Sequence, residues 1–448
     1  MGIQASGLGS GIDSKALIAQ LIDIERQPIR MLDEKRSGFQ AQVSKVGKIT
    51  AALKTLQTKL KALDTQSEVM LTKGVSSNEA AFAITAKSNA PVGSYAIEVQ
   101  QVAKEEKDRS VGFANGQAAV KAGTVSFAVK GGAAQVVTIA EGDSLETVAA
   151  NITKNVKGVS AAVITAAGQT FLQLTALEAG HAVGGSPSDA IVITENSTGA
   201  TGTALAFTET QVAQTAKLTI DGLAVESDKN DITTALPGVT ISVKDLTTKA
   251  EKLTISVDRD AMVTKVKELV DAYNAAMDLV RAETTVSATT DRKASLAGDP
   301  TIRALEQMLK SKFSSPVTSL GSASIAAAAN FGVTSDRVTG KMSVDTTKLQ
   351  TALVTDAQGV VNVLTAADGL ATRLAAAIDG YAGPNGSLQA RTEGLNSSVK
   401  QLDKQKLRLE DRVAKLQEQL TRQFTALETS VSALKNQQQY LASALPST

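Results

Sequence analysis

The chain has 448 residues, and its 46 Lys and Arg residues balance 45 Asp and Glu residues to a formal net charge of +1. This balance argues against a nucleic-acid-binding protein, which needs a basic surface to displace the counterions of phosphate groups. The chain has no Cys, no Trp and one His, which excludes disulfides, thiolate metal sites and cysteine nucleophiles and disfavours the acid–base chemistry of an enzyme.

The N-terminal part of the chain predicts two helices. After a Gly- and Ser-rich start that we expect to be mobile, Asp13 or Ser14 can cap a helix beginning near Lys15. Pro28 is expected to break or kink it. From about residue 32 to 67, apolar residues recur at steps of mostly four and three, which predicts a coiled-coil helix. The apolar stretch of the first helix is too short for a signal peptide and lacks a cationic start.

The middle of the chain, from about residue 80 to 258, predicts a β region with antiparallel hairpins. Its composition shifts to Thr, Val, Ala and Gly, and apolar and polar residues alternate between Gly- and Pro-containing turns. One amphipathic helix is expected at 144–154, and the low-complexity stretch 180–202 is expected to be a loop or a variable edge. The predicted strands are 82–87, 94–101, 124–130, 135–140, 171–175, 217–221, 239–243 and 253–257.

The C-terminal part returns to helix. One amphipathic helix is predicted at 261–284, and a long coiled coil follows a mixed region. Leucines recur every seven residues from Leu388 to Leu416, with Lys406 as the polar exception in the partner heptad position. Beyond Leu416 the apolar stripe moves by four residues, which is a stutter in the heptad pattern. The simplest partner for one long terminal helix is the other, so we expect the two ends to pack together.

These patterns predict an α+β multidomain protein. A terminal α-helical coiled-coil stem carries nested, mainly antiparallel β domains inserted between the helical ends. No run approaches the roughly 18 apolar residues of a transmembrane helix, so no membrane insertion is expected. Four parts are expected: a leg domain of residues 1–42 with 390–448, a helix-rich stem of 43–78 with 261–389, a β domain of 79–106 with 213–260, and a variable β/α insertion of 107–212.

No sequence motif predicts a catalytic, cofactor or metal site. Gly7, Gly9 and Gly11 lack the spacing and the preceding strand of a dinucleotide fingerprint. Asp258 and Asp260 flank Arg259 at a strand-to-helix junction, where a helix cap and ion pairs are expected rather than a catalytic pair. His181 lies in a Gly-rich loop, and we expect it to be a solvated surface residue.

Several short segments, in this order along the chain, resemble the bacterial flagellar filament cap family, also called hook-associated protein 2. The start carries Ser6-Gly-Leu-Gly-Ser-Gly-Ile-Asp13, Leu17-Ile-Ala-Gln-Leu21 and Glu25-Arg-Gln-Pro-Ile29. Further matches are Ala216-Lys-Leu-Thr-Ile-Asp-Gly222 with Leu236-Pro-Gly-Val-Thr240, Ile255-Ser-Val-Asp-Arg-Asp260 with Val270-Asp-Ala-Tyr-Asn274, and Gln423-Phe-Thr-Ala-Leu-Glu428 with Gln439-Tyr-Leu441. The segment 144–176 also looks like the repeat of flagellin and hook-associated proteins, although Thr153 replaces the family's usual Asn.

The resemblance implies a structural protein, not an enzyme, without cofactors. Family members are exported through the flagellar type III apparatus without a cleaved signal and form a homo-oligomeric plate at the extracellular tip of the filament, where they retain flagellin and promote its folding and insertion. The implied partners are further copies of the chain, flagellin, hook–filament junction proteins and, before export, a cytoplasmic chaperone at the C-terminal helix. Our hypothesis for the leg contacts names eight residues: Ile18, Leu21, Ile22, Leu420, Phe424, Leu427, Val431 and Leu434.

Two alternatives remain open at this point. The β region could act as a surface adhesin, a role that need not exclude capping. The chain could also be another flagellar axial or junction subunit, because those proteins combine helical ends with β insertions as well.

Overall fold

The computed structural model of the chain describes residues 13–286 and 290–444. It divides into two compact units: the first joins the N-terminal part up to Val69 with the chain from Val263 onward, and the second is Met70–Met262. The Gly-rich start that we expected to be mobile lies outside the described residues up to position 12. The finer division into four domains stays a prediction.

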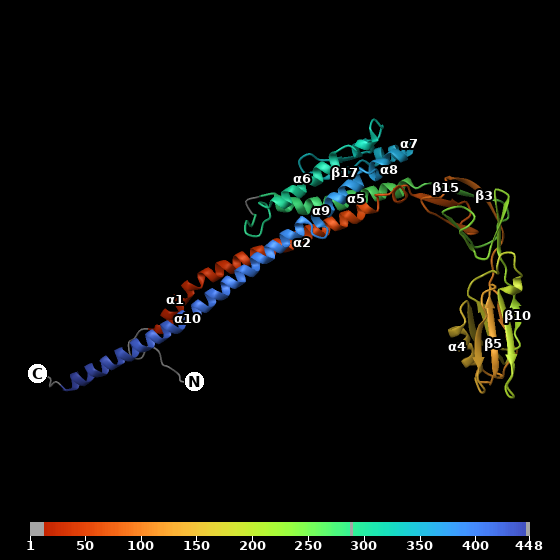
Figure 1. Cartoon of the computed structure of the whole chain (residues 1–448), viewed down its shortest axis with the longest axis horizontal. Coiled ribbons are helices and arrows are strands. Elements are labelled where there is room, and N and C mark those ends of the chain that lie inside the picture. Colours follow the sequence, from red (N-terminus) through yellow and green to blue (C-terminus); the bar gives the residue numbers. More distant parts are fainter. Residues whose placement is uncertain (1–12, 287–289, 445–448) are drawn as a thin grey trace. The chain divides into compact units, whose positions relative to one another are not determined.

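The first unit is mainly helical, and its long helices come from both ends of the chain (Figure 1). Its helices are α1 Ser14–Glu25, α2 Gln27–Lys61, α3 Gln66–Val69, α5 Arg259–Thr284, α6 Pro300–Ser314, α7 Thr346–Thr355, α8 Ala357–Thr365, α9 Leu370–Ala382 and α10 Ser387–Ala444. A small hairpin of β16 Val333–Ser335 and β17 Met342–Val344 completes it. Helix α5 begins at the end of the second unit, where Asp258 Oδ1 accepts the Ala261 N–H, as the predicted cap requires.

The first two helices meet at a break six residues before the predicted start of the second. Asp13 Oδ1 accepts the Ala16 N–H at 3.0 Å and caps α1, as expected. Pro28 lies in the first turn of α2, where its missing N–H costs no helical hydrogen bond, and the break itself is at Arg26. Because the proline opens α2 instead of interrupting it, this helix begins before the predicted residue 32, and it ends at Lys61 instead of about 67.

The two ends of the chain pack together, which confirms the prediction from their heptads. Helix α2 lies beside α10 and α9. Its inward residues are fully or almost fully buried, and they are Val46, Ile49, Leu53, Leu56 and Leu60. On α10 the buried partners include three members of the leucine heptad, Leu388, Leu395 and Leu402. Two ion pairs, Lys45–Glu283 and Lys59–Glu268, join α2 to α5 at 2.9 Å and 2.7 Å.

One stretch of the described chain, Ala357–Leu441, contains a window apolar enough to pass a length and hydropathy test for a membrane span. Half of that window is buried inside the protein. The most apolar helices there, α8 and α9, have 9 and 13 residues, fewer than the roughly 20 that a membrane-spanning helix needs. The window is therefore explained by packing in the first unit.

The second unit is built from antiparallel sheets, as the sequence predicts, with one helix, α4 Leu145–Asn155. A five-stranded sheet has the order β1-β15-β3-β11-β12, and a three-stranded sheet has the order β13-β14-β2. Their strands are β1 Thr72–Ser76, β2 Phe82–Ala86, β3 Gly93–Gln101, β11 Ala216–Ile220, β12 Leu223–Ser227, β13 Asp231–Ile232, β14 Val239–Val243 and β15 Glu251–Val257. Two further sheets, β10-β4-β8-β7 and β6-β5-β9, comprise β4 Lys107–Arg109, β5 Gly123–Val129, β6 Gln135–Ile139, β7 Val159–Ala166, β8 Gln169–Ala176, β9 Ile191–Ser197 and β10 Thr208–Gln211.

This unit has two hydrophobic cores. Side chains of the first two sheets share one of them, including Phe82, Ile97 and Leu253. The other core lies within residues 107–212, where Phe127, Leu172 and the apolar face of α4 pack together. We call residues 107–212 the inserted lobe and the rest of the unit the parent lobe. Ser144 caps α4 through the Thr147 N–H, so the predicted helix is confirmed at its N-terminal end.

Of the expectations for the stretch 180–202, one is corrected, that for His181. The second half of the stretch, expected to be a loop or a variable edge, is the edge strand β9, which pairs with β5 over seven residues. Along this strand the more buried side chains, Ile191, Ile193 and Glu195, alternate with exposed ones. The Gly, Ser and Thr residues around them obscured this pattern in the sequence. His181 is buried, with 7% of its surface exposed, and its Nδ1 lies 2.9 Å from the Ala182 carbonyl oxygen. Composition identifies the Gly-rich loop, but it does not show that the histidine in the loop is buried.

Candidate helical interaction site

Helices α1 and α10 form an antiparallel pair at the ends of the chain. Ser14 Oγ donates a 2.6 Å hydrogen bond to Glu428, whereas Glu25, further along α1, lies 3.9 Å from Arg412, nearer the start of α10. Between these points lies a small apolar cluster. Its buried members are Ile22, Ile29 and Val413, and its half-buried members are Ile18, Leu409, Leu416 and Leu420.

Polar contacts fix the register where α2 begins to follow α10. Lys406, the polar exception in the partner heptad position, donates to both oxygens of Asp33 at 2.7 Å and 2.9 Å. The bond to Asp33 raises the pKa of Lys406 above its usual value. Arg36 and Asp403 pair at 2.9 Å one turn away. Such half-exposed pairs contribute little stability, but they specify which turns of the two helices face each other.

A groove of about 1050 Å³ runs between α1 and α10. Ile18, Ile22 and Phe424 supply its apolar surface. Thr421 and Thr425 add hydroxyl groups from α10. The groove therefore offers a mixed surface that a complementary helix or side chain can contact.

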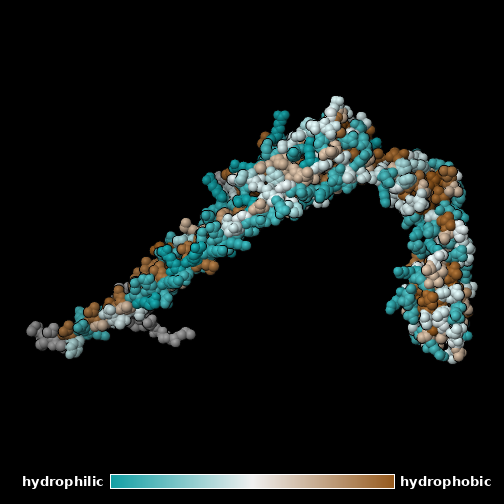
Figure 2. Space-filling model, in the orientation of Figure 1, coloured by the Kyte–Doolittle hydropathy of each residue, from teal (hydrophilic) through white to brown (hydrophobic). Residues whose placement is uncertain are grey.

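Apolar side chains also point outward on both helices. Leu21 is 43% exposed, and on α10 Leu427 and Leu434 are 47% and 64% exposed. Figure 2 shows hydrophobic residues gathering along the stretch that α1 and the end of α10 form. Contiguous exposed apolar surface of this kind is typical of a site for another protein.

The structure divides the eight predicted contact residues into two groups. Ile18, Ile22 and Leu420 pack between α1 and α10 of the same chain, and Phe424 and Val431 are half-buried. Leu21, Leu427 and Leu434 remain exposed. Their role in contacts with other subunits stays a prediction.

Three exposed apolar residues were missed from the sequence: Leu17, Ile24 and Met31. With Leu21 and Pro28 they are spaced at four, three, four and three residues, the same signal that identified the coiled coil elsewhere. The stripe continues into a groove of about 550 Å³ between the start of α2 and α10, lined by Pro28, Met31 and Leu409 among others. The sequence therefore contained a second heptad seam on α1, beside the one that packs on α10.

Nothing among the described residues provides a catalytic centre that we can recognise. No group of three or more His, Asp or Glu residues in that part of the chain is arranged to hold a metal ion. Asp258 and Asp260 lie 4.0 Å and 3.7 Å from Lys73, in agreement with the expected cap and ion pairs.

One buried carboxyl pair was missed from the sequence. Glu106 and Asp108, at β4, are 3% and 5% exposed, so no substrate reaches them. Glu106 accepts the Ile191 N–H at 3.0 Å. Burial, together with the Asp108 charge, raises the pKa of Glu106 to about 8, and burial with the Glu209 charge raises that of Asp108 to about 6.

Comparison with known proteins gives two family matches. Residues 213–436 match the family described as flagellar hook-associated protein 2 C-terminus, and residues 10–106 match flagellar hook-associated protein 2 N-terminus. The chain is 28% identical to the A-type flagellar hook-associated protein 2 of Pseudomonas aeruginosa, over 99% of this chain and 97% of that protein. It is also 28% identical to the flagellar hook-associated protein 2 of Escherichia coli K12, over 98% and 97% of the two chains.

A solved structure shares the fold. The crystal structure of the D1-D2-D3 domains of the flagellar cap protein FliD from Escherichia coli superposes with a TM-score of 0.65 and 26% sequence identity. The match covers 79% of this chain and 99% of that one.

Proposed function

The chain belongs to the flagellar hook-associated protein 2 family, and from this premise we propose how it works as a flagellar cap. As a member of this family it is a structural, non-enzymatic protein that caps the flagellum, at the tip outside the cell. In our proposal several copies close into a plate at that tip. The plate retains exported flagellin and promotes its folding and insertion into the filament.

The helices α1 and α10 act as the leg in this proposal. One observation supports this role. Helices α1 and α10 are already held together by their own apolar cluster, and yet Leu21, Leu427 and Leu434 remain exposed. A helix with a broad apolar face of this kind is suited to a bundle of more than two helices. The additional helices would come from neighbouring subunits at the filament end.

The same surfaces serve different partners at different stages. Before export, the exposed end of α10 would be covered by a cytoplasmic chaperone, and the chain would leave the cell without a cleaved signal through the flagellar export apparatus. At the tip, the leg would contact flagellin, and it would contact hook–filament junction proteins at the start of assembly. An apolar helix end that is exposed in the free chain explains why a protecting partner is useful.

The test places charges on the exposed stripe of α10. A double variant, Leu427→Glu with Leu434→Glu, should fold normally, because both side chains are exposed in the free chain. It should nevertheless fail to support filament growth in cells that lack the unmodified protein, because two carboxylates would have to be desolvated at the contact. The measurement is the number and length of filaments in electron micrographs, beside circular dichroism of the purified chain.

The matched control adds the same two charges outside the stripe, through Gln419→Glu and Gln437→Glu on exposed positions of α10. The control variant should grow filaments as the unmodified chain does. Normal filaments from the stripe variant would refute the leg contact. A stable monomer that is absent from filament tips would refute the plate itself.

A further inference from the structure

The inserted lobe joins the parent lobe through two chain segments that lie side by side. Lys104 and Gln214, one on each segment, exchange backbone hydrogen bonds of 2.9 Å and 3.1 Å. The Gly180 N–H also donates to the Lys104 carbonyl oxygen at 2.9 Å. If these two segments were the only contact between the lobes, they would form a hinge, because two neighbouring segments can bend together. The orientation of the lobes therefore depends on contacts away from this crossing.

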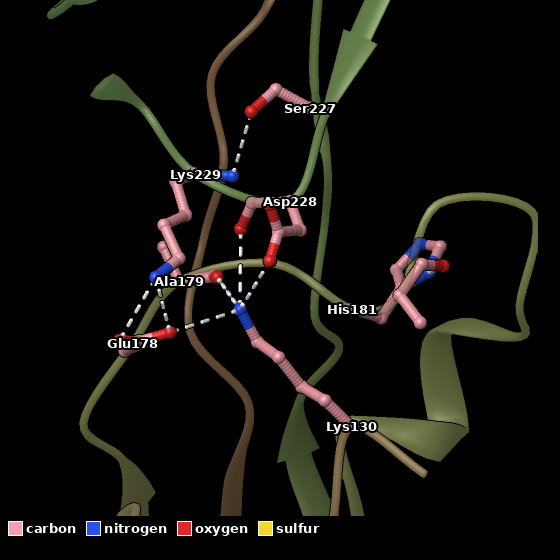
Figure 3. Close-up of polar contacts among 8 residues, drawn as sticks. Lys130, Glu178, Ala179, His181, Ser227, Asp228 and Lys229 are labelled. Carbon is pink, nitrogen blue, oxygen red and sulfur yellow. Dashed lines mark hydrogen bonds and ion pairs between the residues drawn. The ribbon is translucent and has the colours of Figure 1, made fainter. Parts of the chain in front are cut away.

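One such contact is centred on the ammonium group of Lys130, at the end of β5 (Figure 3). Its Nζ donates to the Ala179 carbonyl oxygen at 3.0 Å within the inserted lobe. It also lies 3.2 Å from Asp228 Oδ2 and 3.4 Å from the Asp228 carbonyl oxygen, both in the parent lobe. Only 17% of the Lys130 side chain is exposed. An ammonium group has three donors, and the oxygens of Ala179 and Asp228 offer three acceptors within 3.4 Å.

Two neighbouring charges complete the network. Glu178 lies 3.5 Å from Lys130 Nζ and accepts a hydrogen bond from Lys229 at 3.0 Å. Since Lys229 belongs to the parent lobe, Glu178 makes a second link between the lobes. The hydrogen bond from Lys229 is the largest cause of the lowered pKa of Glu178. His181 lies apart from the ammonium group in this view and takes no part in the network (Figure 3).

The backbone of the inserted lobe beside this network is strained at Lys130 and lies close to the parent lobe at Gly180. Lys130 has a φ of 50°, in the left-handed region that side chains other than glycine rarely adopt. Gly180 has a φ of 75°, and a Cβ there would lie 2.3 Å from the Asp228 carbonyl oxygen. A residue other than glycine persists in this conformation where surrounding contacts hold it, and such residues concentrate at sites with a mechanical or binding role.

We propose that Lys130 is a latch that sets the orientation of the inserted lobe on the parent lobe. Its ammonium group is the one cation of this network that bonds to main-chain oxygens of both lobes. With the latch closed, the two cores of the second unit move as one body. With the ammonium group removed, the Ala179 and Asp228 oxygens lose this donor and the inserted lobe swings about the crossing at Lys104 and Gln214.

The experiment measures a distance between the two lobes in the full chain. The sequence has no Cys, so two introduced cysteines can be labelled without interference. Ala133→Cys and Lys249→Cys place nitroxide labels at exposed positions of the inserted and the parent lobe. Pulsed electron paramagnetic resonance then gives the distribution of label distances. Lys130→Met, which keeps much of the side-chain length without the charge, should broaden the distribution and shift its mean.

Two further variants make the result decisive. Asp228→Ala removes the carboxylate from the opposite lobe and should also broaden the distribution, which tests the latch even if the Lys130 variant does not fold. Lys154→Met removes an exposed lysine from α4 and should leave the distribution unchanged. Circular dichroism verifies that each variant is folded. A folded Lys130 or Asp228 variant with the same distance distribution as the labelled chain without that substitution would overturn the proposal.

Discussion

The buried carboxyl pair predicts that the inserted lobe loosens as the pH rises. Glu106 and Asp108 lie two residues apart at β4, and Glu209 is opposite Asp108 on β10. Asp108 Oδ2 is buried without a hydrogen-bond partner. Folding raises the pKa of Glu106 from 4.5 to about 8 and that of Asp108 from 3.8 to about 6. The folded lobe therefore holds protons that the unfolded chain has already released, so its stability is greatest at low pH and is lost as the pH rises towards 8.

The magnitude follows from proton linkage. Each proton held only by the folded state lowers the free energy of unfolding by about 1.4 kcal/mol per pH unit. One retained proton gives an upper limit of about 3 kcal/mol between about pH 5.5 and 7.5. Since water around the exposed Glu209 screens part of the repulsion, we expect about 2 kcal/mol, which is roughly a 30-fold change in the opening equilibrium.

Hydrogen exchange of β4 and β8 in the full chain, corrected for the intrinsic effect of pH, measures this opening. Glu106→Gln should remove most of the pH dependence, because the amide keeps an acceptor for the Ile191 N–H and cannot ionise. Glu105→Gln is the matched control on the same segment: its carboxylate is half-exposed, and its pKa is lowered by Lys107. If Glu106→Gln retained the full pH dependence of the unmodified chain, ionisation of Glu106 would not be the cause of the opening.

Two further substitutions test the packing of each unit. Gly74→Ala should lower the melting temperature of the second unit and cost about 1–3 kcal/mol of stability, because the new Cβ would lie 2.1 Å from Ile84 Cγ2. Gly47→Ala is the contrasting substitution on α2: a Cβ there would meet no atom within 4 Å. It should raise the stability of the first unit by up to about 1 kcal/mol. Lys406→Leu should keep or raise the melting temperature. The partly exposed pair with Asp33 contributes about 1 kcal/mol at most, whereas a leucine at this position, where 27% of the lysine side chain is exposed, buries most of its apolar surface and adds about 1–2 kcal/mol. Calorimetry of the full chain measures these effects, and a large loss would show that the ion pair is essential.

The sequence by itself determined the elements whose signal is local. The seven-residue recurrence of leucines required a long helix with one apolar stripe, and the complementary stripe at the other end of the chain predicted its partner. Alternation of apolar and polar residues located eight strands, and Ser144 and Asp13 marked the helix starts that the structure shows. These features depend on neighbours within about one or two turns, so the order of residues is sufficient to read them.

Only the tertiary structure decided which residues far apart in the chain meet. Lys406 is a defect in the heptad until Asp33, 373 residues away, lies beside it. Lys130 has no partner in its own segment, and its ammonium group acquires one only when Asp228 approaches from 98 residues away. The burial of Glu106 and Asp108 has the same origin. A charge acquires its environment from the packing of several segments, and that packing has no periodicity in the sequence.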